Sequence, residues 1–330
     1  RVENRRLVSR GLEKLNSSPR PGVQALMEII NADPGTVTAS TIGFGLGPRI
    51  NAAGRLDSAL IAYALLMSPN LDEARHYAEK LQELNSQRQE YTRDAQETVK
   101  EYLDETETDE VPLIFAADSS FKPGIVGLVA GRITEEYFRP SVVVQEGESE
   151  SHASCRSIPQ FNITTALDQC ADLLVRHGGH ALAAGFTVMN ENIPALRDRL
   201  ITMANDSLRG QALVPMLEID LAIDIHRLNK QLVEELSLLE PCGNGNPLPI
   251  FMSKNVHVAE CRAVGKDGKH LKLKISRASQ PPLDAIGFGL GVWTTQMPDR
   301  IDIAYQLEIN DWNGRQYLQA NLQDIRPAKD

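Results

Sequence analysis

Two short segments combine the residue types with which proteins hold phosphate. They are SCRS at 154–157 and GGHALAAG at 178–185. Hydroxyls and backbone N–H groups donate to phosphate oxygens, a guanidinium offers a planar charged fork, and glycine lets the backbone come close. The sequence therefore predicts a phosphodiester pocket built from Ser154, Arg156, Ser157, Gly178, Gly179 and His180.

A third polar segment, TIGFGLGPRINAAGRL at 41–56, is rich in glycine, and we expect it to form a turn. It adds Arg49, Asn51 and Arg55 to the predicted phosphate ligands. Each of these residues has a structural alternative. The arginines could pair with an acidic neighbour such as Asp57, and Asn51 could close a turn.

The first two segments have structural alternatives as well. SCRS alone is compatible with an ordinary polar strand, and His180 could cap the preceding helix. Because the two segments lie one amphipathic helix apart and His180 follows two glycines, contact with phosphate is the preferred interpretation.

Alternating apolar runs predict an α/β unit around these segments. In chain order it contains the strand VPLIFAA, the helix GIVGLVAGRITEEYF, the strands SVVVQ and HASCRS, the helix ITTALDQCADLLVRH and the strand AAGFTVM. Asn162 is expected to cap the second helix. This assignment places Gly178, Gly179 and His180 at the end of a helix, where they can converge on the SCRS strand.

A long helix is predicted from Asn70 to Leu103, because apolar residues recur there at three- and four-residue steps. Asn70 is the expected N-cap, with Glu73 placed to reach it. At 1.5 Å per residue this helix would span roughly 50 Å. Arg88 interrupts its apolar seam and the opposite face is charged, which favours a helix that bridges domains. The acidic stretch 104–110 is the expected linker.

The last third of the sequence changes to short alternating strands with one helix, NKQLVEELSLLE. This pattern predicts a small antiparallel barrel of the OB type. On it, a DNA path is expected along Lys269, Lys272, Lys274 and Trp293. Phe288 and Tyr305 could stack on bases, but we expect them to fill the barrel core.

Composition limits the kinds of protein that this chain can be. A net charge of −10 excludes a surface that coats nucleic acid throughout, so any contact with a polynucleotide must be a local groove. The four cysteines are far apart and form no C-x-x-C pair, which indicates neither a zinc site nor a disulfide framework and fits a reducing cytoplasm. No apolar run is long enough to span a membrane.

Several motifs then occur in a fixed order along the whole chain. They are GPRINAAGRL, the long helix, PGIVGLVAGRI, SCRS, GGHALAAG and PCGNGNPLPIF. In this order the sequence resembles the RecJ family of the DHH phosphoesterase superfamily. The resemblance implies the end of an α/β DHH catalytic domain at 1–69, a connecting helix and linker at 70–107, a DHH-associated domain at 108–210 and an OB-fold domain at 211–330.

The same resemblance implies a 5′→3′ exonuclease that is specific for single-stranded DNA and acts in DNA repair and recombination. Its Mn²⁺ or Mg²⁺ ligands belong to upstream motifs, including Asp-His-His, which do not occur in this sequence. The chain opens on RVENRRLVSRGLEKL, typical of a helix interior, so we expect a fragment that binds the strand without cutting it. We therefore expect no catalytic residue, metal ligand or bound metal in this segment.

Where this family commonly has Trp-His before PGIVG, the chain has Phe121 and Lys122, and Lys122 is expected to meet a phosphate. The implied partners are single-stranded DNA, a single-strand-binding protein and a helicase, with no membrane. Two alternatives stay open. One is a DHH phosphodiesterase for short oligonucleotides or cyclic dinucleotides, and the other is a non-catalytic replication scaffold of the same superfamily.

Overall fold

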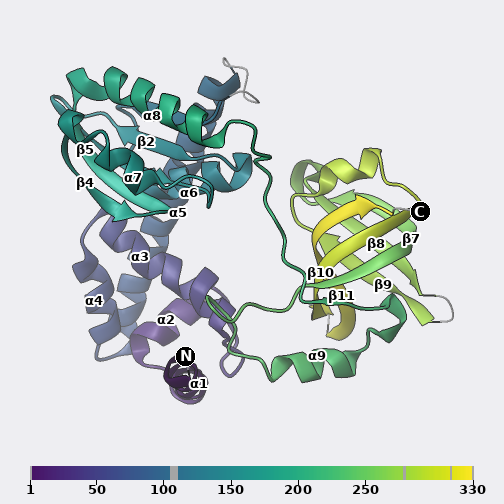
Figure 1. Ribbon diagram of the computed structural model, residues 1–330. Helices are drawn as coiled ribbons and strands as arrows, with labels where there is room; N and C mark the ends of the chain where they lie inside the picture. The colour runs from purple at the N-terminus through teal and green to yellow at the C-terminus, as the bar shows by residue number, and fades with distance from the viewer. Residues whose placement is uncertain (1, 105–110, 278–279, 313, 329–330) are drawn as a thin grey trace. The chain divides into compact units, whose positions relative to one another are not determined.

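The computed structural model describes residues 2–104, 111–277, 280–312 and 314–328 (Figure 1). Contacts divide the chain into two compact units, residues Arg6–Pro215 and residues Met216–Asp330 with Arg1–Arg5. Most of the predicted acidic linker, 105–110, lies outside the described residues. The helices and the sheet between Arg6 and Pro215 form one unit by their contacts. The predicted domain boundaries after residues 69, 107 and 210 stay a prediction.

The first unit begins with helices that pack around the long helix α5. They are α1 (Val2–Ser17), α2 (Pro21–Ile29), α3 (Gly47–Leu56), α4 (Ala59–Met67) and α5 (Leu71–Asp104). The predicted long helix is therefore confirmed, and the Asn70 side chain accepts a hydrogen bond from the backbone N–H of Glu73 at 2.9 Å. Apolar residues between Ala74 and Leu84 of α5 are buried against α2, α3 and α4. Apolar residues between Ala95 and Leu103 are buried against the α/β part that follows in the chain.

The run before α3 differs from the expected turn. Residues Thr41–Leu46 form a π-helix that continues directly into α3. Leu46 is buried in the helical core, and a Cβ at Gly45 would lie 2.7 Å from the Ile30 side chain. Gly45 therefore permits close packing against Ile30, and tertiary packing overrides the weak helix propensity of the glycines in this run.

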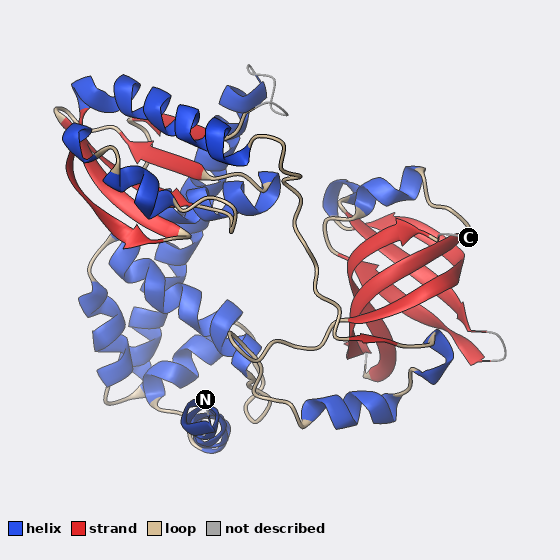
Figure 2. Cartoon of the chain, viewed as in Figure 1, coloured by secondary structure: helices blue, strands red, loops and turns tan. Residues whose placement is uncertain are grey.

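A five-stranded sheet follows, with the order β1-β2-β3-β5-β4 (Figure 2). Its strands are β1 (Ile114–Asp118), β2 (Ser141–Gln145), β3 (Glu150–Arg156), β4 (Leu174–His180) and β5 (Ala183–Met189). Helix α6 (Val126–Tyr137) packs on one face together with α5, and α7 (Ile163–Asp168) and α8 (Ile193–Leu208) pack on the other. Only β1 and β2 are parallel.

The segment before the second phosphate motif corrects the sequence prediction. The expected helix through His177 ends at Asp168, and after a short 3₁₀ turn at Ala171–Leu173 the chain forms strand β4. Two successive glycines disfavour a helix, and the free edge of β5 offers backbone hydrogen-bonding partners. Gly178, Gly179 and His180 therefore lie in an edge strand and not at a helix end.

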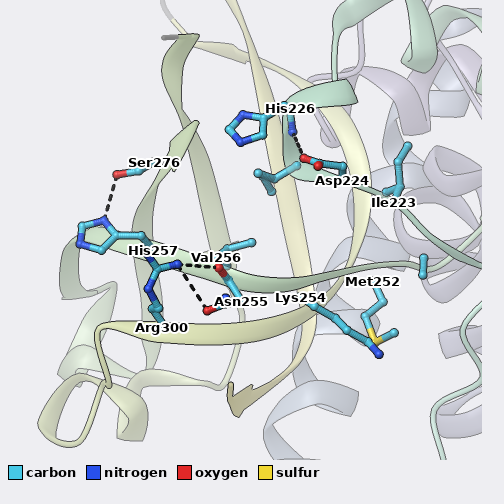
Figure 3. A pocket seen from close by; sticks show the side chains of 12 residues that line it. Ile223, Asp224, His226, Met252, Lys254, Asn255, Val256, His257, Ser276 and Arg300 are labelled. Carbon is cyan, nitrogen blue, oxygen red and sulfur yellow. Dashed lines mark hydrogen bonds between the residues drawn. The ribbon is translucent and has the colours of Figure 1, made fainter. Parts of the chain in front are cut away.

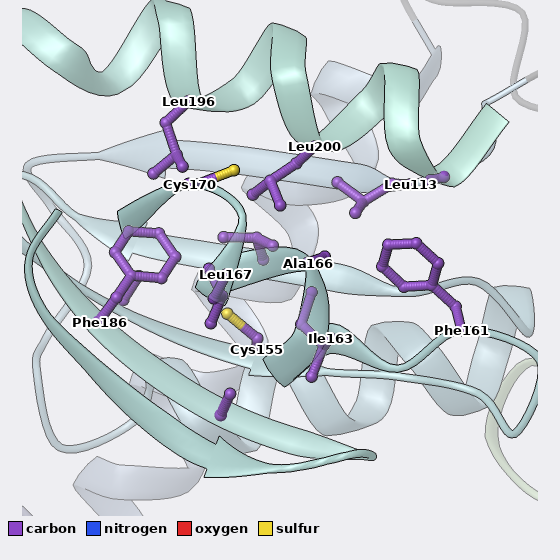
Figure 4. Close-up of a cluster of buried hydrophobic side chains, with 14 of the residues drawn as sticks. Leu113, Cys155, Phe161, Ile163, Ala166, Leu167, Cys170, Phe186, Leu196 and Leu200 are labelled. Atoms are coloured by element: carbon purple, nitrogen blue, oxygen red, sulfur yellow. The ribbon is translucent and has the colours of Figure 1, made fainter. Parts of the chain in front are cut away.

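The core between the sheet and α8 contains two cysteines (Figure 4). Cys155 of β3 points toward α7, and Cys170 lies below Leu196 and Leu200 of α8. Burial raises the pKa of Cys155 to about 12. Cys242 and Cys261, in the other unit, are only partly buried. All four thiols are free.

This difference predicts the order of alkylation. Iodoacetamide at pH 8 is expected to modify Cys242 and Cys261 in the native protein, while Cys155 and Cys170 react only after unfolding, because a buried thiol is neither accessible nor ionised. Peptide mass spectrometry over a time course measures the four rates. Native-state labelling of Cys155 as fast as that of Cys261 would contradict the placement of β3.

The second unit is a closed barrel of five strands, as predicted for an OB fold. The strands are β7 (Phe251–Val264), β8 (His270–Arg277), β9 (Gln280–Gly287), β10 (Arg300–Trp312) and β11 (Arg315–Pro327). They pair as an antiparallel β7-β8-β9 meander, a parallel β9–β11 contact, and antiparallel β11–β10 and β10–β7 pairs that close the barrel. A short β6 (Leu221–Ala222) adds to β7, and Asn229 caps α9 (Lys230–Ser237).

Tyr305 fills this barrel, as expected. Its side chain is fully buried and its hydroxyl lies 2.9 Å from that of Ser253. Burial raises the pKa of Tyr305 to about 12. The ring is therefore unavailable to a base.

Candidate phosphate-binding site

Strand register brings the two phosphate motifs onto one face of the sheet. Arg156 lies opposite Ala183, which lies opposite His180. Two pairs further along, Ser154 lies opposite Gly185, which lies opposite Gly178. Directly paired residues point to the same side of a sheet. Arg156, Ser154 and His180 therefore share a face, and between them the floor consists of alanine and glycine.

This face is the one on which α6 packs, opposite the core of Figure 4. Ser154 pairs with Val143, which is buried beneath α6. Strand β4 lies two strands beyond β3, so the backbones at Arg156 and His180 are roughly 10 Å apart. Residues Gly178 and His180 are exposed, and Arg156 and Ser154 are half-buried. An anion can reach both sides of this floor.

The start of α6 meets the SCRS strand at Gly127. A Cβ built there would lie 3.3 Å from the Ser154 hydroxyl and 3.5 Å from a terminal guanidinium nitrogen of Arg156. The N-cap of α6 is Ile125, whose side chain cannot accept a hydrogen bond from the first N–H groups. A helix N-terminus carries unpaired donors and partial positive charge, which favours an anion. Three kinds of donor therefore converge: a helix end, a hydroxyl and a guanidinium.

The end of α3 contacts the same turn. Arg55 donates from Nη1 to the carbonyl of Gly124 at 3.1 Å. A Cβ at Gly124 would lie only 1.8 Å from the Arg55 carbonyl oxygen, so the two backbones touch because residue 124 is glycine. Asp57, the alternative partner of Arg55, instead lies 3.7 Å from Lys80. The structure thus places the predicted Arg55 at the start of α6.

Lys122 precedes this turn and is exposed. Its ammonium lies 5.9 Å from the centre of the Tyr91 ring on α5. A cation held over an aromatic face gains a modest attraction and remains available to solvent. Lys122 therefore lies near the predicted site.

Other predicted residues have different contacts. Arg49 donates to the Gln82 side chain and to the Gly45 carbonyl, both at 2.7 Å, and burial lowers the pKa of its guanidinium. Asn51 is exposed on α3. Ser157 is buried, and its hydroxyl donates to the Phe161 carbonyl at 2.6 Å. Arg49 and Ser157 thus make hydrogen bonds within the fold, and their predicted contact with phosphate stays a prediction.

Gly179 also has a structural role. Its side faces the core of Figure 4, and a Cβ there would lie 2.4 Å from the Ala183 carbonyl oxygen and 2.7 Å from the Ala184 side chain. Its φ of +155° lies in the region that L side chains rarely adopt. Gly178, in contrast, has open space around its Cβ position. Of the two glycines, Gly178 therefore forms the floor and Gly179 permits the strand contact.

The same face carries a cation that the sequence interpretation missed. Arg176 of β4 pairs with Thr187, which pairs with His152 of β3. Arg176 Nε donates to the Thr187 hydroxyl at 3.0 Å, and His152 Nδ1 lies 3.1 Å from the same oxygen. Residues two apart on a strand share a face, so assigning β4 as a strand is enough to place Arg176 on the same side as Gly178.

The outer face of the barrel carries the second group of predicted residues. Lys272 pairs with Arg262 on one side and Ile286 on the other, whereas Lys274 lies between Glu260 and Asp284 and bonds Glu260 at 3.1 Å. Lys269 is exposed in the loop before β8. Positive charge is therefore concentrated at the Lys272 end of these strands, and acidic neighbours offset it at Lys274.

The aromatic residues on the barrel correct the prediction. Trp293 is half-buried and packs against the barrel core, so only part of its ring is exposed to solvent. Phe288, expected in the core, is 63% exposed and lies edge-on to His270, with ring centres 5.3 Å apart. The turn after β9 directs Phe288 outward, beside the Lys272 end of the sheet. It is the better stacking candidate.

A cavity of about 650 Å³ opens elsewhere on the barrel unit (Figure 3). It is lined by Asp224, His226, Lys254, His257 and Arg300, among others. Arg300 donates to the Asn255 carbonyl at 3.1 Å, and His257 lies 3.0 Å from the Ser276 hydroxyl. No residue that the sequence singled out lines this cavity.

The donor set does not fit a divalent metal. Among the described residues, no three His, Cys, Asp or Glu side chains are placed to hold a metal ion together.

No helix in the described ranges has the length and apolar character needed to cross a bilayer.

Comparisons with known proteins agree with this architecture. The model of the DHHA1 domain matches residues 110–206, and that of the RecJ OB domain matches residues 219–324. The single-stranded-DNA-specific exonuclease RecJ of Bacillus subtilis is 32% identical over 326 residues, covering 98% of this chain and 41% of the relative. RecJ of Escherichia coli is 31% identical over 339 residues, covering 99% of this chain and 58% of the relative.

Solved structures give the same result. The crystal structure of RecJ from Thermus thermophilus in complex with Mn²⁺ matches with a TM-score of 0.85 and 30% identity, covering 99% of this chain and 47% of that chain. A complex of RecJ from the same organism with Mg²⁺ matches with a TM-score of 0.84. The chain thus contains a DHHA1 domain followed by a RecJ OB domain, and it is similar to RecJ proteins over nearly its whole length. It spans about half the length of the relatives that it matches.

Proposed function

We propose that this chain is the substrate-binding part of a RecJ-like 5′→3′ exonuclease and that it binds the 5′-phosphorylated end of single-stranded DNA. The observation that supports this most is the convergence at Gly127. There the start of α6, the Ser154 hydroxyl and the Arg156 guanidinium meet. Arg55 adds a cation one helical turn away.

The proposed pocket holds the terminal phosphate against the first turn of α6. Arg156 and Ser154 donate to its oxygens from one side. His180 donates from the far side of the glycine and alanine floor, where the absence of larger side chains lets the strand end enter. Lys122 supplies further charge near the mouth. A terminal phosphate has more negative charge than an internal diester, so such a pocket selects the strand end and sets direction.

The trailing strand is proposed to follow the barrel. Lys269, Lys272 and Arg262 contact its backbone, and Phe288 stacks on a base. Base–aromatic stacking on single strands contributes roughly 1–3 kcal/mol per base. Lys274 and Trp293 contribute less than the sequence alone suggests, because one is paired with Glu260 and the other is packed on the core. A strand held at two places would be digested processively.

The longer protein is proposed to cleave DNA with Mn²⁺ or Mg²⁺ held by residues outside this segment. Structures of RecJ relatives are complexes with these ions. This longer protein acts in DNA repair and recombination in the cytoplasm. Its partners are a single-strand-binding protein and a helicase.

Strand length tests this function. A single strand of about 20 nucleotides, longer than the roughly 4–16 that one OB fold occupies, is expected to bind at least about 10-fold more tightly than a dinucleotide or a blunt duplex of the same length. Fluorescence anisotropy at fixed salt measures the three affinities. Equal affinity for the dinucleotide would support the short-substrate phosphodiesterase instead, and metal-dependent digestion by the 330-residue chain alone would refute a purely binding role.

A further inference from the structure

Arg88 of α5 is a buried cation that neither the motifs nor the proposed pocket uses. It is 9% exposed. Its Nη2 donates to the neutral Asn85 side chain at 2.8 Å, and its Nε has no hydrogen-bond partner within the described ranges. No acidic side chain in the described part of the chain pairs with it. A buried charge without a counter-charge is costly, and one is usually retained for a reason beyond stability.

The packing of α5 on α6 shows where Arg88 lies. Lys100 bonds Glu136 at 2.5 Å and Gln96 bonds Arg132 at 2.8 Å, so the two helices run in the same direction with a constant offset. Residues four apart lie on the same helix face. Two such steps back from Gln96 arrive at Arg88 on α5, and the same eight residues back from Arg132 arrive at Gly124, in the turn just before α6 begins at Val126. Arg88 therefore lies near the turn that precedes α6, where Tyr91 of α5 also meets Lys122.

Other cations surround this point. Arg55 donates to the carbonyl of Gly124, in the same turn. Burial lowers the pKa of Arg88, and the positive charges of Arg132 and Arg55 lower it further. Arg132 bonds only the neutral Gln96 in the described structure, apart from its helix. Three guanidinium groups thus gather near the start of α6, and none of them forms a salt bridge with a residue that the structure describes.

This group is separate from the Ser154–Arg156 pair. That pair approaches α6 at Gly127, in the first turn of the helix, whereas Arg55 bonds the carbonyl of Gly124, in the turn two residues before α6 begins. The two sets of donors approach α6 from different elements, one from β3 and the other from α3 and α5. A strand whose terminal phosphate lies at Gly127 would present its next phosphates within reach of the second set.

We propose that Arg55 and Arg88 form a second phosphate subsite, which takes an internal phosphodiester adjacent to the bound 5′ end. Arg55 contacts the diester, and Arg88 is a positioning residue that supplies buried positive charge beneath it. The subsite rests on the proposed function, since it needs a strand whose end is already held. The pocket and the subsite together bind two successive phosphates of the strand, the terminal one and an internal one.

Single neutral linkages test the subsite. Oligonucleotides with a 5′-phosphate carry one methylphosphonate, which removes the charge of one diester, at each of the first few positions in turn. For the unmodified chain, one position is expected to weaken binding by about 5- to 10-fold, as for loss of one charge-assisted hydrogen bond. In Arg88→Met and in Arg55→Met that penalty is expected to fall below about twofold, while Arg88→Lys keeps most of it.

Arg93→Met is the matched control, because Arg93 lies on the same helix, is exposed and pairs with Asp94. It is expected to behave as the unmodified chain. If the penalty persists in Arg55→Met and Arg88→Met while the preference for a 5′-phosphate remains, the subsite is refuted and the proposed function stands. Loss of any 5′-phosphate preference in the unmodified chain refutes the proposed function itself. Should thermal unfolding show that Arg88→Met does not fold, the exposed Arg55→Met decides the outcome.

Discussion

Replacing Arg156 by alanine is expected to weaken binding of a 5′-phosphorylated oligonucleotide by about 10- to 100-fold, the effect of losing roughly 1.5–3 kcal/mol of charge-assisted hydrogen bonding. Binding of the same strand without its phosphate should change much less. The guanidinium makes one local hydrogen bond, to the Cys155 carbonyl at 2.8 Å, so the fold should tolerate the change. Anisotropy titrations with both oligonucleotides measure the two losses.

The control for this experiment is Arg197→Ala. Arg197 lies on α8, on the opposite side of the sheet, and bonds Asp198 at 3.3 Å. Its removal lowers net positive charge equally but leaves the phosphate-binding face unchanged, so both affinities should stay within about twofold, as for exposed charges of this kind. Equal losses with both oligonucleotides in Arg156→Ala would mean that Arg156 contacts the strand without recognising its end.

The second large effect is expected at Gly124. Alanine at this position would place a Cβ 1.8 Å from the Arg55 carbonyl oxygen and 2.7 Å from its carbon, so the end of α3 must move away from α6. Such overpacking typically lowers the free energy of unfolding by about 1–3 kcal/mol. Because Arg55 is carried on the displaced segment, affinity for a phosphorylated strand should fall as well. Urea unfolding and anisotropy measure the two losses.

Gly131→Ala, within the helix that follows this turn, is the matched control. Nothing lies within 4 Å of its Cβ position, so alanine should stabilise α6 by up to about 1 kcal/mol, the difference in helix propensity. A Gly124→Ala protein with the same unfolding midpoint as Gly131→Ala would show that α3 and α6 do not touch as described.

Together these experiments probe one physical idea, an anion held between a helix start and a strand. The Arg156 variant tests whether strand β3 binds the anion. The Gly124 variant tests the contact between the end of α3 and the turn before α6. The Arg88 variants test whether the buried positive charge contributes to binding. A defect confined to phosphorylated ends would separate recognition from general loss of fold.

Strong local patterns predicted much of this protein. The apolar spacing of 70–103 is long enough to define α5, and the alternating strands of the last third define the barrel. The two phosphate motifs also meet in the fold. Ser154, Arg156 and His180 lie on a single face, as the prediction of a shared pocket requires.

The errors have a common physical origin. Residues 174–180 form a strand because β5 offers an unpaired edge, which no local propensity reports. Gly178 and Gly179 face opposite sides of the sheet because side chains alternate along a strand. Ser157 follows the end of β3, and its hydroxyl donates to the Phe161 carbonyl. Residue type alone places Phe288 in the core, although its position just after β9 leaves it exposed.

Local chemistry and periodicity were enough to predict the residue types that this protein uses and most of the regular elements that carry them, because both depend on a few turns of chain. Which of those residues meet depends on the tertiary fold. The register of β3, β5 and β4 brings Arg156 and His180 onto one face, and the backbone contact at Gly124 brings Arg55 to the turn before α6. These are long-range backbone contacts between elements, whose energies arise only when the elements pack.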